Sequence, residues 1–153
     1  MKILIVSDSH RNDELLMELV KEYPKMDLYL HAGDSQSIPE YIYPFDSCLG
    51  NCDSYPFDEK RFIRTEFGNI LMKHFPYLTD KEKENIKVFI HGHTHRYKAE
   101  IIDNILIINP GSISLSRDNS NGSFAILTMD EHQIKVDVID IFSKVILTSL
   151  QIM

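Results

Sequence analysis

The stretch Ile90-His91-Gly92-His93-Thr94-His95 places three histidines within five residues. It continues the apolar run 87–90, whose β-prone residues predict a buried strand. Gly92 lets the backbone turn sharply where this strand ends, so we expect His93 and His95 in a loop at its carboxyl edge. Neutral imidazole is the commonest metal ligand in proteins, and the stretch therefore favours metal binding over a solvated surface cluster of histidines.

Size and composition narrow the function classes. The chain has 153 residues, and we expect 1–153 to form one domain. Its formal net charge of -7 supplies no basic face, so we expect no extended nucleic-acid binding. The apolar run 3–6 is far too short for a secretory or membrane segment. Cys48 and Cys52 form no C-x-x-C pair, and we expect a protein of the reducing cytoplasm, with no membrane partner.

The order of the predicted elements indicates two sheets. Strands at 2–7 and 27–31 flank a helix over 12–22, which Asn12 or Asp13 would cap. We then expect a short helix or loop at 36–45, a strand at 47–49, a hairpin with arms 60–67 and 69–73, and a short helix from Thr79 to Asn85. Further strands are predicted at 87–90, 97–103, 105–109, 123–129 and 133–141, while 144–153 fits either strand or helix. This mixture predicts two packed sheets with helices outside.

Side chains that can bind metal follow several of these strands at their carboxyl ends, where α/β proteins build their sites. The group consists of Asp8, His10, Asp34, Asn51, His74, His93 and His95. Carboxylate, imidazole and amide ligands suit Mn²⁺, Fe or Zn²⁺ better than they suit a thiolate-preferring ion. Seven candidates are too many for one ion but suit two ions that share a bridging carboxylate.

The same residues, in order, resemble the motifs of the calcineurin-like metallophosphoesterases. They are Asp8-x-His10, Gly33-Asp34, Gly50-Asn51-Cys52-Asp53, His74 and Gly92-His93-Thr94-His95. The Asn-Cys-Asp variant, the run Asn109-Pro110-Gly111-Ser112 and the small size resemble the YfcE-type small phosphodiesterase branch. The resemblance covers roughly residues 1–142 and implies an α/β fold, a four-layer α/β/β/α sandwich of two packed mixed sheets.

The resemblance also implies roles for the site residues. One divalent ion would be held by Asp8, His10, Asp34 and His95, and a second by Asp34, Asn51, His74 and His93. Asp34 would bridge the two ions, and a metal-bound hydroxide would attack a small phosphodiester, with Asp34, Asn51 and His93 as the catalytic residues. Asn51, Arg11 and Arg96 are expected to contact the phosphate, although a solvated surface role fits each arginine equally well. Mn²⁺ is the first expectation for the ions, with Ni²⁺, Zn²⁺, Fe²⁺ or Mg²⁺ as alternatives.

Two departures from the family pattern bear on activity. Relatives have His-Gly-His where this chain has His74-Phe75-Pro76, which alters the pocket on one side. The larger superfamily often carries a histidine where this chain has Cys52, so we expect either substrates with a good leaving group or a proton delivered through water. The alternative function is a protein-binding scaffold, because the retromer subunit of similar sequence uses the fold in that way. The oligomeric state stays open, and the hairpins and the apolar tail could supply the interface of a homo-oligomer.

Several neighbouring residues have competing interpretations. We expect His31 and His91 to be buried or supporting side chains and not metal ligands. Cys52 is expected to be a buried, inert thiol. Asp53 would either orient a ligand histidine or serve as a turn residue, and Ser112 would either donate a hydrogen bond near the metals or complete the Pro-Gly turn.

Overall fold

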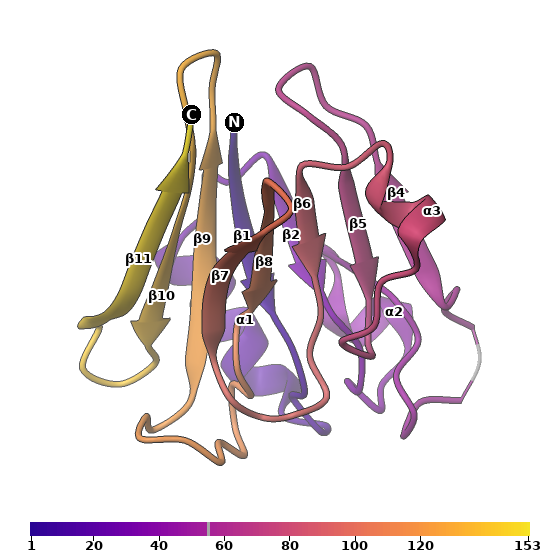
Figure 1. Cartoon of the computed structure of the whole chain (residues 1–153). Coiled ribbons are helices and arrows are strands. Elements are labelled where there is room, and N and C mark those ends of the chain that lie inside the picture. The colour runs from indigo at the N-terminus through magenta and orange to yellow at the C-terminus, as the bar shows by residue number, and fades with distance from the viewer. Residues whose placement is uncertain (55) are drawn as a thin grey trace.

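Two mixed β-sheets pack against each other in the computed structural model, which describes residues 1–54 and 56–153 (Figure 1). The first sheet has the order β11-β10-β9-β1-β2-β3, with bounds Ile146–Ile152, Ile134–Asp140, Ser123–Met129, Lys2–Val6, Leu28–His31 and Phe45–Ser47. The second has the order β4-β5-β6-β8-β7, with bounds Lys60–Ile63, Ile70–Lys73, Val88–Ile90, Ile105–Asn109 and Lys98–Ile102. The expected pair of mixed sheets is confirmed.

Parallel strands form the centre of each sheet. β1 pairs in parallel with β2, and β2 with β3, while β5 and β8 flank β6 in parallel. The strands β1, β5 and β6 all run downward in the view of Figure 1. The loops that follow the parallel strands of both sheets therefore meet at one end of the molecule, which is where a shared site can form.

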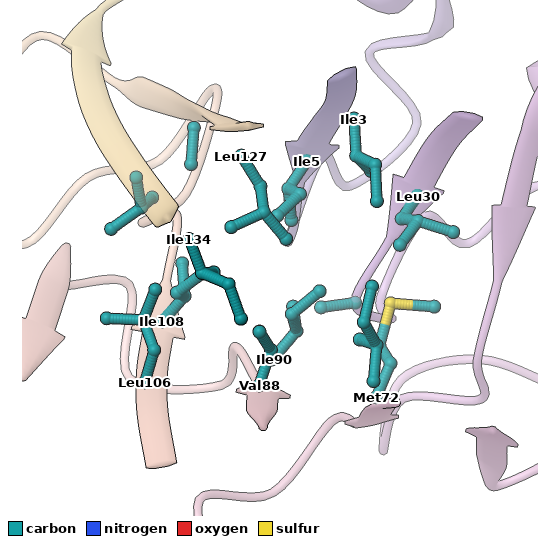
Figure 2. Close-up of a cluster of buried hydrophobic side chains, with 14 of the residues drawn as sticks. Ile3, Ile5, Leu30, Met72, Val88, Ile90, Leu106, Ile108, Leu127 and Ile134 are labelled. Atoms are coloured by element: carbon teal, nitrogen blue, oxygen red, sulfur yellow. The ribbon is translucent and has the colours of Figure 1, made fainter. Parts of the chain in front are cut away.

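The main core fills the space between the sheets (Figure 2). Ile3 and Ile5 on β1 point into it, toward Met72 and Ile90 from the second sheet. The alternate residues of β1 pack with helix α1 in a second cluster, so the strand is buried on both faces as its continuous apolar run predicts. Burial of each such side chain contributes about 1.5–3 kcal/mol to folding, which anchors the strand that carries Asp8.

In the part of the chain that the structure describes, three helices lie outside the sheets. Helix α1 spans Asp13–Glu22 and begins at Asn12, whose side chain accepts the backbone N–H of Leu15. The short helices α2 and α3 span Pro39–Ile42 and Asp80–Lys83, and Thr79 caps α3 in a reciprocal capping box with Glu82. Within the described residues, none of the helices is long and apolar enough to cross a membrane.

Two expectations about strands change. The third strand lies at Phe45–Ser47 and not at 47–49, because the Phe45 ring packs edge-on against Tyr29 and draws the strand toward Pro44. Cys48 still donates its backbone N–H to His31 O at 3.1 Å, and the chain leaves the sheet after it, so that Gly50 lies against Gly33 and Asp34. The open question at the C-terminus is settled by β11, which is a strand paired antiparallel with β10.

Candidate metal centre

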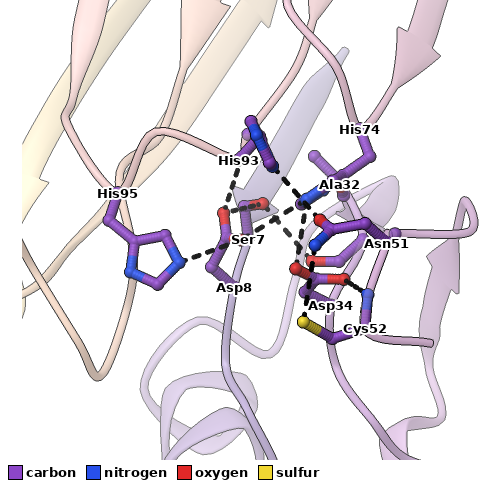
Figure 3. Close-up of polar contacts among 12 residues, drawn as sticks. Ser7, Asp8, Ala32, Asp34, Asn51, Cys52, His74, His93 and His95 are labelled. Atoms are coloured by element: carbon purple, nitrogen blue, oxygen red, sulfur yellow. Dashed lines mark hydrogen bonds and ion pairs between the residues drawn. The ribbon is translucent and has the colours of Figure 1, made fainter.

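The loops after β1, β2, β3, β5 and β6 converge on a cluster of carboxylates and imidazoles (Figure 3). In this view Asp8 lies between His95 on one side and the group of Asp34, His74 and Asn51 on the other. The side chains of Asp8 and His74 have essentially no exposed surface, and Asp34 is nearly as buried. Charged groups are rarely buried unless they are paired or bind a metal, so this cluster requires an explanation.

One oxygen of Asp8 has no hydrogen-bond donor. Asp8 Oδ2 accepts from Ser7 Oγ at 2.7 Å and from the backbone N–H of His93 at 3.1 Å. Asp8 Oδ1 is buried and unpartnered, as is Nε2 of His74, which lies 3.7 Å away. The Nε2 atoms of His95 and His10 lie 3.3 and 3.9 Å from the same oxygen. A cation between these atoms would satisfy the orphaned oxygen and nitrogen together.

The surroundings of three histidines leave Nε2 free to bind a metal. The Nδ1 atom of His10 lies 2.7 Å from Gln36 Oε1, that of His74 2.8 Å from Ala32 O, and that of His95 2.7 Å from Leu115 O. An amide oxygen only accepts, so Nδ1 donates in each case and Nε2 carries the lone pair. The Nε2 atoms of His10 and His95 lie only 3.3 Å apart. Metal-binding histidines are typically oriented in this way.

Asp34 links the two sides of the cluster. Its Oδ2 lies 3.2 Å from His74 Nε2, and its Oδ1 accepts the backbone N–H of Cys52 at 2.8 Å. Three overlapping groups have ligand atoms within 4.8 Å of one another: Asp8 with His10 and His95, Asp8 with Asp34 and His74, and His10 with Asp34 and Cys52. The donor set is mainly oxygen and imidazole nitrogen, which fits a divalent ion of borderline or hard character.

Other sequence-predicted residues lie at the margin of the cluster. His93 and Asn51 contact each other, with Nδ1 3.1 Å from Oδ1, and His93 belongs to none of the three groups of clustered carboxylate, imidazole and thiol donors. Arg11 is exposed and lines a cavity of about 400 Å³ beside Gln36 and Cys52. Arg96 is exposed in the loop after His95. The structure thus brings five of the seven expected ligands together closely and leaves His93 and Asn51 as a neighbouring pair.

The electrostatics of the cluster keep its carboxylates ionised. Burial opposes ionisation of Asp8, but contacts with His95 and His74 outweigh it and hold its pKa below the usual range. Burial likewise opposes ionisation of Asp34, while His74 and the Cys52 amide lower its pKa to about 2. Asp8 raises the pKa of His95, and the two carboxylates raise that of His74 against the effect of burial. The cluster thus concentrates negative charge that attracts cations.

The backbone around the cluster is strained. Seven of the ten non-glycine residues with positive φ in the described chain belong to these loops: Asp8, His10, Arg11, Asp34, Gln36, His93 and His95. Such conformations cost free energy and concentrate at functional sites. Two glycines permit the close approach of the loops, because a Cβ at Gly50 would lie 2.0 Å from Asp34 Oδ1 and a Cβ at Gly92 would lie 2.0 Å from Ser7 Oγ. The fold thus tolerates local backbone strain where it brings the candidate ligands together.

Supporting residues explain how the loops are held. Asp53 binds backbone N–H groups of Asp34, Gln36 and Gly50, so it orients main chain and not a histidine. Ser112 Oγ donates to the backbone oxygen of Asp8 at 2.8 Å. Gln36 was missed from the sequence, because a glutamine two residues after Asp34 gives no local signal of its contact with His10.

Cys52 is exposed, so the expectation of a buried thiol is wrong. Its backbone N–H binds Asp34, which turns the loop outward and leaves the side chain at the rim of the site. Partial burial and the nearby Asp34 carboxylate raise the pKa of this thiol. It is therefore protonated and uncharged at neutral pH.

His31 and His91 are buried outside the cluster of donors, as expected. His31 contacts Ser9 Oγ through Nε2 at 2.8 Å and accepts the backbone N–H of Gly33 through Nδ1. His91 stacks on Phe89 beneath its own loop. Burial lowers the pKa of both imidazoles to about 4, so both are neutral supports of the loops.

Comparisons with known proteins give a consistent result. The family model of the calcineurin-like phosphoesterase superfamily domain matches residues 1–132. A probable metallophosphoesterase of Bacillus subtilis, YsnB, is 32% identical over 144 residues, which cover 85% of each chain. A solved structure from Streptococcus pneumoniae, described as an uncharacterised predicted phosphoesterase, is 27% identical with a TM-score of 0.86 and covers 99% of this chain and 96% of that one. The phosphoesterase Yfce of E. coli shares the fold, with 21% identity, a TM-score of 0.80 and 98% of each chain covered.

Proposed function

Because this chain belongs to the calcineurin-like phosphoesterase superfamily, we propose that it is a two-metal phosphodiesterase that hydrolyses a small phosphodiester. The family supports a phosphoric ester hydrolase. The observation that carries the proposal is the buried Asp8 Oδ1, which has no hydrogen-bond partner and faces the Nε2 atoms of three histidines. Burying an unpartnered carboxylate oxygen costs free energy, and a bound cation would offset this cost by coordinating the oxygen and the imidazole nitrogens.

The proposed ligand sets follow the motif order. One ion takes Asp8, His10, Asp34 and His95, and the other takes Asp34, Asn51, His74 and His93, so that Asp34 is shared. The clustered donors around Asp8 and Asp34 support these sets. The contact between His93 and Asn51 keeps both side chains beside His74, where the second set needs them.

Divalent ions in this site would supply Lewis-acid stabilisation of the phosphoryl oxygens and an activated water. The side chains then have separate roles. Asp34 is shared by the two ligand sets, and Asn51 contacts a phosphate oxygen of the substrate. His93 lies beside Asn51. Arg11 and Arg96 are proposed to contribute positive charge at the rim. The protonated Cys52 is a weak acid, so substrates with a stable leaving anion are favoured.

The scaffold alternative has less support. All seven donor positions keep ligand side chains, and at least two buried polar atoms remain unpartnered unless a cation binds them. A surface that serves only to bind a partner has no need of this costly interior. We propose Mn²⁺ as the preferred ion and the cytoplasm as the location, since Cys48 and Cys52 are both free thiols.

The decisive experiment combines metal analysis with a substrate panel. The purified protein is stripped with chelator, titrated with Mn²⁺, Ni²⁺, Zn²⁺ and Mg²⁺, and assayed with bis-4-nitrophenyl phosphate and 4-nitrophenyl phosphate. We expect about two ions per chain and faster cleavage of the diester. Asp34→Asn should lose bound metal and about 100-fold or more of the activity. The matched variant Asp58→Asn, at an exposed position, should retain both. Unchanged stoichiometry and turnover in Asp34→Asn would refute the proposal.

A further inference from the structure

A cavity of about 500 Å³ opens beside His74 and Asn51. Its lining includes Phe75, Tyr77, Lys60 and Lys73. The volume falls within the range of about 300–1,000 Å³ that is typical of small-molecule sites. Since His74 and Asn51 belong to the proposed second ligand set, a group attached to a phosphate at the centre reaches this cavity directly.

The Phe75 ring forms a fixed wall of the cavity. Its centroid lies 4.8 Å from that of His93, with the planes tilted by 52°, and 5.5 Å from that of His74 in an edge-on arrangement. These contacts hold the ring against two proposed ligands, yet 43% of the residue remains exposed. Tyr77 adds a second exposed aromatic side chain to the same cavity. Exposed aromatic surface of this kind is favourable when another ring covers it.

The charges in the cavity disfavour an anionic occupant. Lys60 Nζ lies 2.8 Å from Glu82 Oε2, and Lys73 Nζ lies 2.9 Å from Glu82 Oε1. Both lysines are therefore already paired with one carboxylate. Glu59 lines the cavity as well and adds a negative charge. A second phosphate in the cavity would be repelled by the Glu59 carboxylate, whereas an uncharged ring would pack against Phe75 and Tyr77.

We propose that this cavity binds an uncharged aromatic group of the substrate, such as an aryl ring or a nucleobase, and that Phe75 determines this specificity. The inference rests on the proposed phosphodiesterase function and names its substrate class. Phe75 acts through contact with the organic group and takes no part in the chemical step. Loss of this ring should therefore raise KM for aryl substrates more than it lowers kcat.

The test uses two phosphonates that cannot be hydrolysed, measured by calorimetry on the Mn²⁺-loaded protein. Phenylphosphonate should bind about tenfold more tightly than methylphosphonate. Phe75→Ala and Phe75→Leu should each reduce this preference to about threefold or less, with methylphosphonate affinity retained as evidence of an intact site. Phe142→Ala removes an exposed ring from the β10–β11 turn, away from the cavity, and should keep the full preference. For bis-4-nitrophenyl phosphate, the Phe75 variants should raise KM more than they lower kcat.

The outcomes separate the two proposals. Equal affinity of the wild-type protein for both phosphonates, or a preference that survives in Phe75→Ala, overturns the aromatic cavity while hydrolysis of esters still supports the phosphodiesterase. If the protein binds neither phosphonate and cleaves no ester with any metal, the proposed phosphodiesterase function is refuted, and the cavity assignment is refuted with it.

Discussion

Asp53 accepts the backbone N–H of Asp34, with 2.8 Å between Oδ2 and the nitrogen. The same oxygen accepts the N–H of Gly50 at 2.8 Å, and Oδ1 accepts that of Gln36 at 2.7 Å. One carboxylate therefore joins the loop after β2 to the loop after β3. Because Gln36 contacts His10, this joint positions Asp34 directly and His10 through Gln36.

Asp53→Asn should weaken metal binding roughly 10–100-fold, the usual cost of losing a group that orients ligands. The amide keeps one acceptor oxygen but turns an NH₂ group toward a backbone N–H, so at least one of the three bonds is lost. Mn²⁺ titration followed by calorimetry measures the effect. Asp58→Asn makes the same change at an exposed position and should leave the affinity unaltered. Equal dissociation constants for both variants would show that the joint is not needed.

Gly92→Ala should destabilise the fold by about 1–3 kcal/mol and impair metal binding, because the new methyl group would collide with Ser7 Oγ and come within 2.7 Å of Asp8 Oδ2. The collision also makes the effect testable by a double-mutant cycle. Ser7→Ala removes the nearest atom, so the double variant should be less destabilised than the sum of the two single variants. Additive losses in urea denaturation would contradict a direct collision.

The sequence was sufficient for most of the strands and for bringing Asp8, His10, Asp34, His74 and His95 together. Continuous apolar runs, such as that of β1, mark strands buried on both faces, and the residues that follow them must lie at one edge of parallel sheets. Asp8 and Asp34 could therefore be placed together before any contact was known. The apolar runs along the chain are therefore enough to predict that these two carboxylates lie close together.

The supporting contacts could not be predicted in the same way. Ser112 binds the backbone oxygen of Asp8 across 104 positions of the chain, and no local pattern encodes such a contact. The positive φ angles of His10 and His95 could not be predicted from the sequence either, since they are imposed by the loops around these residues. Cys52 was misjudged for a related reason, because its exposure depends on how its own N–H reaches Asp34.

Glu82 should make the stability of the fold depend on acid pH. Burial opposes its ionisation, but Lys60, the Thr79 amide and Lys73 lower its pKa to about 2 from 4.5. Its contribution is present in full above about pH 4.5 and is lost as the pH falls through about 2. Glu82→Gln should therefore cost roughly 1–3 kcal/mol at neutral pH and much less near pH 2.

Urea denaturation across this pH range checks the prediction. Glu84→Gln provides the control, because it changes an exposed glutamate at the end of the same helix. It should follow the wild-type profile throughout. A Glu82→Gln curve that runs parallel to the wild type at every pH would mean that the two lysine pairs do not stabilise the fold.

Metal loading should stabilise the fold in a pH-dependent manner. At a free Mn²⁺ concentration of 100 times its dissociation constant, the free energy of unfolding should rise by about 2.7 kcal/mol for each bound ion. The pKa values of His74 and His95 are raised, so protons compete for the same Nε2 atoms and the gain should shrink from about pH 8 to about pH 6. Thermal unfolding with and without chelator measures it. His132→Gln, in an exposed turn, should behave as the wild type, whereas Asp34→Asn should lose most of the gain. A gain of the same size at both pH values, at a fixed free Mn²⁺ concentration, would place the ion away from these imidazoles.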